Sequence, residues 1–379
     1  MKLLYITQGI GPVFQSQVVE LLNKLEKRKL FSEIYLMVGL RNSNDIEKVY
    51  SLNNNIKLKI FKTYPEYPFF DFLTENAIQK SFKDIGINEK YILHVRSELF
   101  GMLAYNAYFK MYSKKPNILI DIRGSVIEEI KLYGKMNSIF KYLKLSGYAS
   151  NVQKVLSNVN YINTVSNELK NYIKVRYEIR PDCIYTIPTI AGETFTYDKK
   201  IRQKIRKLLN IGDNEILFVF SSGSSQAWQN DDEIVDSLTS KGYKILMLTK
   251  KHYDDPNIIS KFVPYNEVPN YLNAADIGII IRNDDIVNNV ASPIKFSEYI
   301  ACGLPVISTR AVNIITDILI DNNCGSLLNL FKINDTEIDD LISLDREHIS
   351  EIGMKYFSVN KITDKYIEVY KNMVVTSGQ

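Results

Sequence analysis

The chain has 379 residues, of which 45% are hydrophobic and 24% charged, as is typical of globular proteins. At roughly 150 residues per domain this length predicts two domains, each able to bury a core without disulfides or a structural metal. The 47 Lys and Arg residues nearly balance the 43 Asp and Glu residues, and the net charge of +4 argues against a nucleic-acid-binding protein. The three cysteines, Cys183, Cys302 and Cys324, include no C-x-x-C pair, which predicts free thiols in the cytoplasm.

Short β-branched runs alternate with longer amphipathic segments along the whole chain, as in α/β proteins with parallel sheets. The strands expected in the first half are Leu3–Thr7, Ile34–Gly39, Ile56–Phe61, Tyr91–Val95, Asn117–Ile122, Tyr161–Val165 and Cys183–Ile187. Those expected in the second half are Ile216–Phe220, Lys244–Thr249, Ile277–Ile281 and Pro305–Ser308. Helical patterns such as Gln15–Arg28 and Leu99–Tyr112 lie between strands, so the sequence predicts two doubly wound, Rossmann-like domains facing a cleft. No run is long and apolar enough for a membrane-spanning helix.

The domain boundary is expected at Ala191, where Pro188, Gly192 and a polar stretch to Lys200 interrupt the strand and helix patterns. The domains are therefore residues 1–191 and 192–357. A last helix, at about 358–379, has no strand after it, which leaves it free to pack back on the first domain.

Gly9 and Gly11 follow the first strand and precede a helix, a position where backbone can approach a ligand closely. As G-x-G without a third glycine, the pattern is a weak indication of a nucleotide site. A tight turn that needs positive φ at glycine explains it equally well.

The most informative segment runs from Ser292 to Ile307. Ser292 suits a helix N-cap, Pro293 the first helical position and Gly303 the residue beyond the helix end. The sequence therefore predicts a short helix of known direction, with Ile294 and Lys295 in its first turn.

Lys295 at the start of that helix is disfavoured by the helix dipole by about 0.3–1 kcal/mol unless an anion binds there. Glu298 lies one turn further on the same face, where its carboxylate can accept two ribose hydroxyls. The pair predicts a nucleotide lying along the helix, and the alternative is an exposed ion pair between positions i and i+3.

This segment resembles the donor-binding signature of the GT-B glycosyltransferases, in particular the large retaining GT4-like family. The family typically has Glu, seven residues and Glu here; Glu298 matches the second position and Val290 stands at the first. Some polysaccharide-type transferases carry a similar Ser-Pro-x-Lys-x-x-Glu-Tyr version. The resemblance extends in order over most of the chain, through the Gly9 loop, His94–Ser97, Asp121–Gly124, Thr164–Ser166, Ile187–Pro188, Phe220–Ser224 and Ala274–Asp276.

Other donor contacts are expected at strand ends of the second domain. Arg282 can clamp a diphosphate or pair with Asp284 or Asp285. Backbone amides and hydroxyls of a loop after the Ile216–Phe220 strand can contact phosphate or sugar; these residues are Ser222, Gly223 and Ser224. Nearby Trp228 can stack on a base or anchor a helix in the core.

In the first domain, four polar residues end two strands and are expected to converge on an acceptor: His94, Arg96, Asp121 and Arg123. A buried Asp–Arg brace and a core histidine are the alternative. The sequence has no Asp-x-Asp and no triad of histidines. We therefore expect no metal cofactor, with Lys295, Arg282 and helix amides stabilising the leaving phosphate.

Residues 131–167 contain five lysines and no Asp or Glu: Lys131, Lys135, Lys141, Lys144 and Lys154. Interleaved apolar residues make this segment a candidate for contact with an anionic membrane or a lipid diphosphate. A solvated helix face is the alternative.

The resemblance implies transfer of a sugar from a nucleotide-diphosphate sugar to a glycan or lipid-linked acceptor, in surface polysaccharide biosynthesis and with retention of configuration. The expected location is the cytoplasm, including the inner face of the plasma membrane. Two alternatives remain: a non-catalytic GT-B subunit that stabilises a partner transferase, and a nucleotide-sugar epimerase or hydrolase on the same fold.

Overall fold

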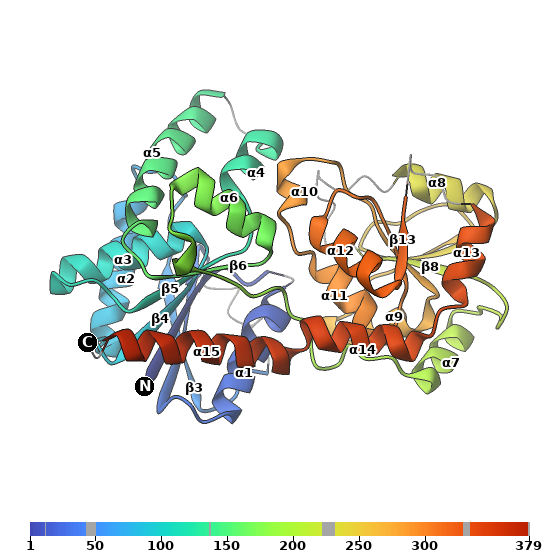
Figure 1. Ribbon diagram of the computed structural model, residues 1–379, viewed down its shortest axis with the longest axis horizontal. Helices are drawn as coiled ribbons and strands as arrows, with labels where there is room; N and C mark the ends of the chain where they lie inside the picture. Colours follow the sequence, from blue (N-terminus) through green and yellow to red (C-terminus); the bar gives the residue numbers. More distant parts are fainter. Residues whose placement is uncertain (12, 43–50, 136–137, 222–231, 329–333, 378–379) are drawn as a thin grey trace. The chain divides into compact units, whose positions relative to one another are not determined.

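The computed structural model describes residues 1–11, 13–42, 51–135, 138–221, 232–328 and 334–377 (Figure 1). The chain divides into a first unit, Met1–Pro188 with Ile362–Gln379, and a second unit, Thr189–Lys361. The division falls between Pro188 and Thr189, whereas the sequence analysis set it at Ala191. Each unit is built on its own parallel sheet, so the predicted fold class of two doubly wound α/β domains is confirmed.

The sheet of the first unit has seven strands in the order β3-β2-β1-β4-β5-β6-β7. In chain order the strands are β1 (Lys2–Gln8), β2 (Glu33–Leu40), β3 (Ile56–Lys62), β4 (Tyr91–Arg96), β5 (Ile118–Ile122), β6 (Tyr161–Thr164) and β7 (Ile184–Thr186). The helices are a π-helical turn (Gln15–Val19), α1 (Glu20–Lys27), α2 (Asp71–Ile85), α3 (Glu98–Tyr112), α4 (Val126–Tyr133), α5 (Ser138–Leu156), α6 (Asn167–Tyr177) and a 3₁₀ turn (Pro181–Cys183). Strand order reverses beside β1, so its loop lies at a topological switch point.

The second unit has six strands in the order β10-β9-β8-β11-β12-β13. They are β8 (Leu217–Ser221), β9 (Lys244–Leu248), β10 (Ile258–Lys261), β11 (Ile277–Ile280), β12 (Val306–Ser308) and β13 (Gly325–Leu327). The helices are α7 (Lys199–Leu208), α8 (Asp232–Ser240), a 3₁₀ turn (Tyr265–Glu267), α9 (Val268–Ala274), α10 (Ile286–Asn289), α11 (Ile294–Ala301), α12 (Asn313–Asn322), α13 (Asp335–Ile342) and α14 (Arg346–Phe357).

Alternation along the strands of the second unit gives its sheet two apolar faces. Val219 and Ile280 belong to a core that also includes buried residues of α11, α12 and α14. Phe218 and Ile279, their sequence neighbours, belong to a second core with residues of α8 and α13. Because successive side chains of a strand point to opposite faces, near-continuous apolar strands require helices on both sides.

Helix α15 (Val359–Ser377) belongs to the first unit from Ile362 onward and packs on its sheet (Figure 1). Tyr161 on β6 donates a hydrogen bond to the carbonyl of Asn372, and Asn117 donates one to the carbonyl of Met373. The opposite face of the sheet contacts α3, where a Cβ at Gly101 would lie 2.7 Å from Ile120. Helix α15 thus closes one face of a sheet formed by residues far from it in sequence.

Every predicted strand is present within one or two residues of its expected ends. Two short edge strands, β10 and β13, were not predicted. Their residues are only half-buried or exposed, so their sequences lack a continuous apolar run. In the described part of the chain no helix is long and apolar enough to cross a membrane.

Candidate functional site

Parallel pairing brings the carboxyl ends of β4 and β5 together in the first unit. Arg96 pairs with Asp121 in register, and Asp121 in turn pairs with Asn163 on β6. His94 lies two residues before Arg96 and therefore points to the same face of the sheet, the face that α15 covers. The strands thus gather the four predicted first-domain residues, with Asn163 as a fifth that the sequence analysis missed.

His94 is completely buried. Its Nδ1 lies 2.6 Å from the hydroxyl of Tyr370 on α15, and its ring contacts those of Tyr5 and Tyr366. Burial lowers the pKa of His94 below its usual value, with the carboxylate of Asp121 opposing that effect. These contacts make His94 a neutral residue that fastens α15 to the sheet, so an acceptor contact is left to the more exposed arginines.

Asp121 is the buried centre of a polar network. Its Oδ1 accepts a hydrogen bond from Asn163 at 2.7 Å and lies 3.5 Å from Nη1 of Arg123. Burial alone raises the pKa of Asp121, but the charge of Arg123, with smaller effects of His94 and Arg96, brings it well below the usual value. Arg123 also donates to Oε1 of Gln17 at 2.9 Å. Asp121 is therefore an ionised brace that fixes the Arg123 guanidinium.

The loop after β4 has a strained backbone. Ser97 has φ 75° and ψ 150°, a conformation that residues other than glycine rarely adopt, and its hydroxyl caps α3 by accepting from the amide of Phe100. Strain of this kind costs about 1–3 kcal/mol and is concentrated at functional sites. Ser97 lies between Arg96 and Glu98, at the carboxyl edge of the sheet, where ligand-binding loops of parallel sheets are found.

Glu98 opens α3 directly after this strained residue and is buried. Burial raises the pKa of Glu98 to about 7, and the negative charge of Glu129 adds to the effect. Glu98 was not predicted from the sequence, because a carboxylate in the first turn of a helix is too common to indicate a functional site.

Gly9 and Gly11 lie at the carboxyl end of β1. Gly9 has φ +65°, and its amide donates to the carbonyl of Gly39 at 2.8 Å. Space is open around the position of a Cβ at both glycines. The positive φ of Gly9 agrees with the tight turn that was the alternative interpretation. At Gly11 no neighbouring atom fills the space beside the backbone, so a ligand can approach it there.

In the second unit, α11 begins at Ile294, with Pro293 as its N-cap and no side-chain cap. The prediction of Ser292 as the N-cap is therefore wrong. The Ser292 hydroxyl instead lies 3.1 Å from that of Thr189, because Pro293 is still extended (ψ 125°) and delays the helix by one residue. Gly303, with φ +69°, follows the helix end as predicted.

The first turn of α11 is positively charged, and its lysine pairs with Glu298 in the next turn. It contains no acidic residue, and Lys295 adds a cation to the positive end of the helix dipole. The Phe296 amide donates to the Pro293 carbonyl at 3.1 Å, whereas the amides of Ile294 and Lys295 precede the first hydrogen bond of the helix. An anion at this turn would satisfy both the amides and the lysine.

Lys295 and Glu298 form an ion pair with 3.1 Å between Nζ and Oε2. The Lys295 side chain is 29% exposed and that of Glu298 only 3%, so this is not the exposed pair of the alternative interpretation. Burial raises the pKa of Glu298, and Lys295 opposes the effect. Helix α11 is also anchored to the end of β8, because the Tyr299 hydroxyl accepts a hydrogen bond from the Ser221 amide at 2.8 Å.

Arg282 is buried just after β11 and directly precedes the loop that leads to α11. Its amide donates to the hydroxyl of Thr309 at 3.1 Å, and that hydroxyl donates to the Arg282 carbonyl at 2.9 Å. Of the two nearby acids, Asp285 caps α10 and Asp284 accepts a hydrogen bond from Asn289. The structure therefore fixes the backbone of Arg282 beside β12.

Several predicted residues fall outside the described part of the chain, namely Ser222, Gly223, Ser224 and Trp228. Within the described ranges, no three His, Cys, Asp or Glu side chains gather as a metal site.

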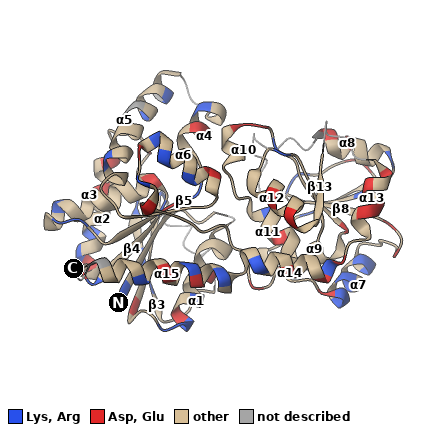
Figure 2. Ribbon diagram, viewed as in Figure 1, with Lys and Arg blue, Asp and Glu red and all other residues tan. Residues whose placement is uncertain are grey.

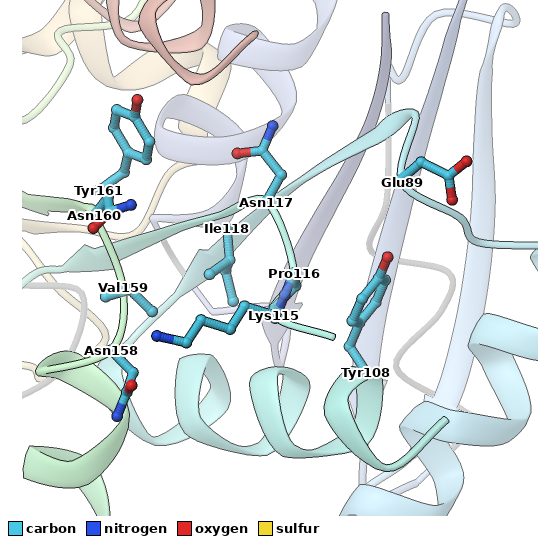
Figure 3. Close-up of a pocket in the computed structure, with 10 residues that line it drawn as sticks. All are labelled: Glu89, Tyr108, Lys115, Pro116, Asn117, Ile118, Asn158, Val159, Asn160 and Tyr161. Carbon is cyan, nitrogen blue, oxygen red and sulfur yellow. The ribbon is translucent and has the colours of Figure 1, made fainter. Parts of the chain in front are cut away.

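A cavity of about 290 Å³ lies at the opposite edge of the first unit's sheet, at the amino-terminal ends of β5 and β6. Figure 3 shows Tyr108 and Glu89 on one side of it, residues 158–161 on the other and Lys115 between them. Ligand loops of parallel sheets lie at the carboxyl edge, so this cavity is separate from the strand-end residues described above.

No protein-family model matches the sequence, and comparison with curated proteins finds no match. Solved structures match over nearly the whole chain. A glycosyltransferase from Rickettsia africae has a TM-score of 0.70 at 17% identity, covering 98% of both chains. Sucrose-phosphate synthase from Thermosynechococcus elongatus has a TM-score of 0.70 at 13% identity over 99% of both chains. Anabaena HepE, solved with UDP and glucose, has a TM-score of 0.69 at 12% identity over 98% of this chain and 99% of that one. The likeness shows that the chain has the GT-B fold of these proteins.

We predict that Glu98→Gln changes how stability depends on pH. In the folded chain the pKa of Glu98 is about 7, against 4.5 for an unperturbed glutamate, so folding favours its protonated form. The wild type should lose stability relative to the variant as pH rises from about 4.5 to 7, by on the order of 2–3 kcal/mol. Urea unfolding at pH 4.5, 6 and 8 measures this difference, with the exposed Glu89→Gln as control. A constant difference across these pH values would contradict the burial of an ionisable Glu98.

Proposed function

We propose that this chain is a GT-B glycosyltransferase that takes its donor sugar from a nucleoside diphosphate. One observation carries the proposal: the first turn of α11 has no side-chain cap and no acidic residue, yet carries Lys295. This turn provides two kinds of group that recognise phosphate, backbone amides and an ammonium. The presence of UDP in the HepE structure supports a nucleotide of this type.

In the proposed complex, the diphosphate binds at the start of α11 and Lys295 contacts it. Glu298, one turn further along, accepts the ribose hydroxyls. Arg282 and the loop 222–224 supply further phosphate contacts. Negative charge develops on the diphosphate as the sugar leaves, and fixed positive groups lower the free energy of that state. We propose that these groups do this without a metal ion.

The acceptor is proposed to bind the first unit, where Arg96 and Arg123 lie at the carboxyl edge of the sheet. Asp121 and Gln17 fix the Arg123 guanidinium, so it can hold an acceptor oxygen in one orientation. We further propose a retaining, GT4-like transfer to a glycan or lipid-linked saccharide of a surface polysaccharide. The bond from the sugar to phosphate breaks, the bond to the acceptor oxygen forms, and the leaving phosphate takes the acceptor proton, so no protein base is required.

Thermal unfolding with UDP, GDP, ADP, CMP and their sugar conjugates tests the donor site. Ligand at 100 times its dissociation constant stabilises a protein by about 2.7 kcal/mol, and we expect one nucleotide to do so. Lys295→Ala should abolish most of that shift, because it removes the charge at the phosphate. Lys204→Ala, an exposed lysine of α7, is the matched control. A shift that Lys295→Ala and Glu298→Ala leave unchanged would contradict the site; no shift with any nucleotide would favour a non-catalytic subunit.

We also propose contact with an anionic membrane through α5. The α5 surface lies at the end of α4 and the start of α5. It consists of the exposed Leu132, Ile139, Tyr142, Leu143, Lys131 and Lys135 and the half-buried Lys141, with Lys131 also paired to Glu128. Ile139 and Tyr142 are 66% and 71% exposed and lie on one face of the helix with Leu143. Figure 2 shows basic and no acidic residues along α5. This combination suits lipid headgroups, with about 1 kcal/mol per lysine near the surface.

Co-sedimentation with vesicles tests this contact. We expect more wild-type protein to sediment with vesicles containing phosphatidylserine than with phosphatidylcholine alone, because the lysines are attracted to negative charge. The double variant Ile139→Ser, Tyr142→Ser should lose most of the binding, whereas Val175→Ser, an exposed valine of α6, should keep it. Equal sedimentation with neutral and anionic vesicles would exclude this role of the α5 surface.

A further inference from the structure

The loop between β3 and α2 exposes aromatic side chains at the carboxyl edge of the first unit's sheet. We call residues 64–72 the aromatic loop; its aromatic residues are Tyr64, Tyr67, Phe69, Phe70 and Phe72. Phe69 and Phe72 are 55% and 54% exposed, and the rings of Tyr67 and Phe69 stack with centroids 5.5 Å apart. Large exposed apolar groups gathered in one place mark interaction sites more often than isolated ones do.

Glu66 holds this loop in a defined position. Its Oε1 accepts a hydrogen bond from Gln8 at the end of β1 at 2.6 Å, and its Oε2 lies 3.3 Å from Nζ of Lys144 on α5. A Cβ at Gly147 would lie 2.9 Å from Pro68, so α5 also packs directly against the loop. The aromatic rings are therefore presented from a loop tied to the sheet and to a helix, and need little ordering on binding.

Carboxyl groups accompany the exposed rings. Asp71 begins α2 between Phe70 and Phe72, and burial together with Glu66 and Glu75 raises the pKa of Asp71 to about 6. Carboxylates accept short, strong hydrogen bonds from hydroxyl groups. The combination of exposed rings and carboxyl oxygens complements a molecule with both C–H faces and hydroxyl groups.

We propose that the aromatic loop is a binding subsite for the saccharide acceptor, with Phe69 and Phe72 against the faces of its sugar rings and Asp71 accepting from its hydroxyls. This subsite rests on the proposed function, since it names the chemistry of the acceptor on the first unit. A carbohydrate suits the loop better than an anionic lipid headgroup does, because Lys144 already pairs with Glu66 and Lys110 with Glu75, while Asp71 adds a carboxyl group beside the exposed rings.

The position in the fold supports this assignment. Gln8, which is bonded to Glu66, immediately precedes Gly9 and the open space at the switch point beside β1. The aromatic loop, the Gly9–Gly11 loop and the strand-end arginines thus all follow carboxyl ends of one parallel sheet. A saccharide chain held on the loop would extend along the edge that contains Arg96 and Arg123.

The test uses the full chain on an array of immobilised oligosaccharides, with binding of the purified protein as readout. We expect the wild type to bind a subset of the glycans and Phe69→Ala, Phe72→Ala to lower that binding at least tenfold. Phe109→Ala, an exposed phenylalanine of α3 outside the loop, should bind like the wild type. Asp71→Asn, which keeps the shape of the side chain, should weaken binding to a smaller extent.

Three results would overturn the subsite: no binding of any glycan by the wild type, unchanged glycan binding by the double phenylalanine variant, or a loss in that variant of sedimentation with phosphatidylserine vesicles while glycan binding stays intact. The nucleotide-induced thermal shift of the same variant should equal that of the wild type. Failure of the donor site appears in that shift and failure of the aromatic loop in the array, so the two proposals fail separately.

Discussion

Parallel pairing of strands is the constraint on which the rest of this structure depends. Because all strands of a unit run the same way, every loop that follows a strand lies at one edge of the sheet. In the first unit this edge contains the glycine loop, Arg96, Arg123 and the aromatic loop. In the second unit it contains Arg282 and the start of α11, both of which follow β11. The chemistry proposed for the chain uses only groups at these two edges, each within its own unit.

Polar residues at such an edge serve two different purposes, and burial distinguishes them. His94, Asp121 and Asn163 are fully buried, and their contacts with one another and with Tyr366 and Tyr370 hold α15 on the sheet. They stabilise the unit that carries Arg123. Lys295 is different because it is partly exposed and stands where the helix dipole disfavours a cation. Its partner Glu298 lies in the next turn, so a partly exposed cation at the start of a helix is the stronger indication of an anion site.

The sequence predicted the fold class and nearly all strands, because strands that are buried on both faces of a sheet have continuous apolar, β-branched sequences. It also predicted that His94, Arg96, Asp121 and Arg123 converge, because the carboxyl ends of neighbouring parallel strands lie side by side. It failed at Ser292 and Pro293, because the helix start depends on backbone conformation, and Pro293 is extended and becomes the N-cap itself. Glu98 and the aromatic loop were missed because their environment comes from α5 and from Glu129, which lie far from them in sequence.

The central claim is that the start of α11 binds the diphosphate of a nucleotide. A crystal structure of the protein with the nucleoside diphosphate that stabilises it most tests this directly. We predict a phosphate oxygen within hydrogen-bonding distance of Lys295 Nζ and of the first-turn amides of α11, with the ribose hydroxyls on Glu298. A nucleotide bound elsewhere, such as in the cavity beside Lys115, or one bound with Lys295 still paired only to Glu298, would contradict the account.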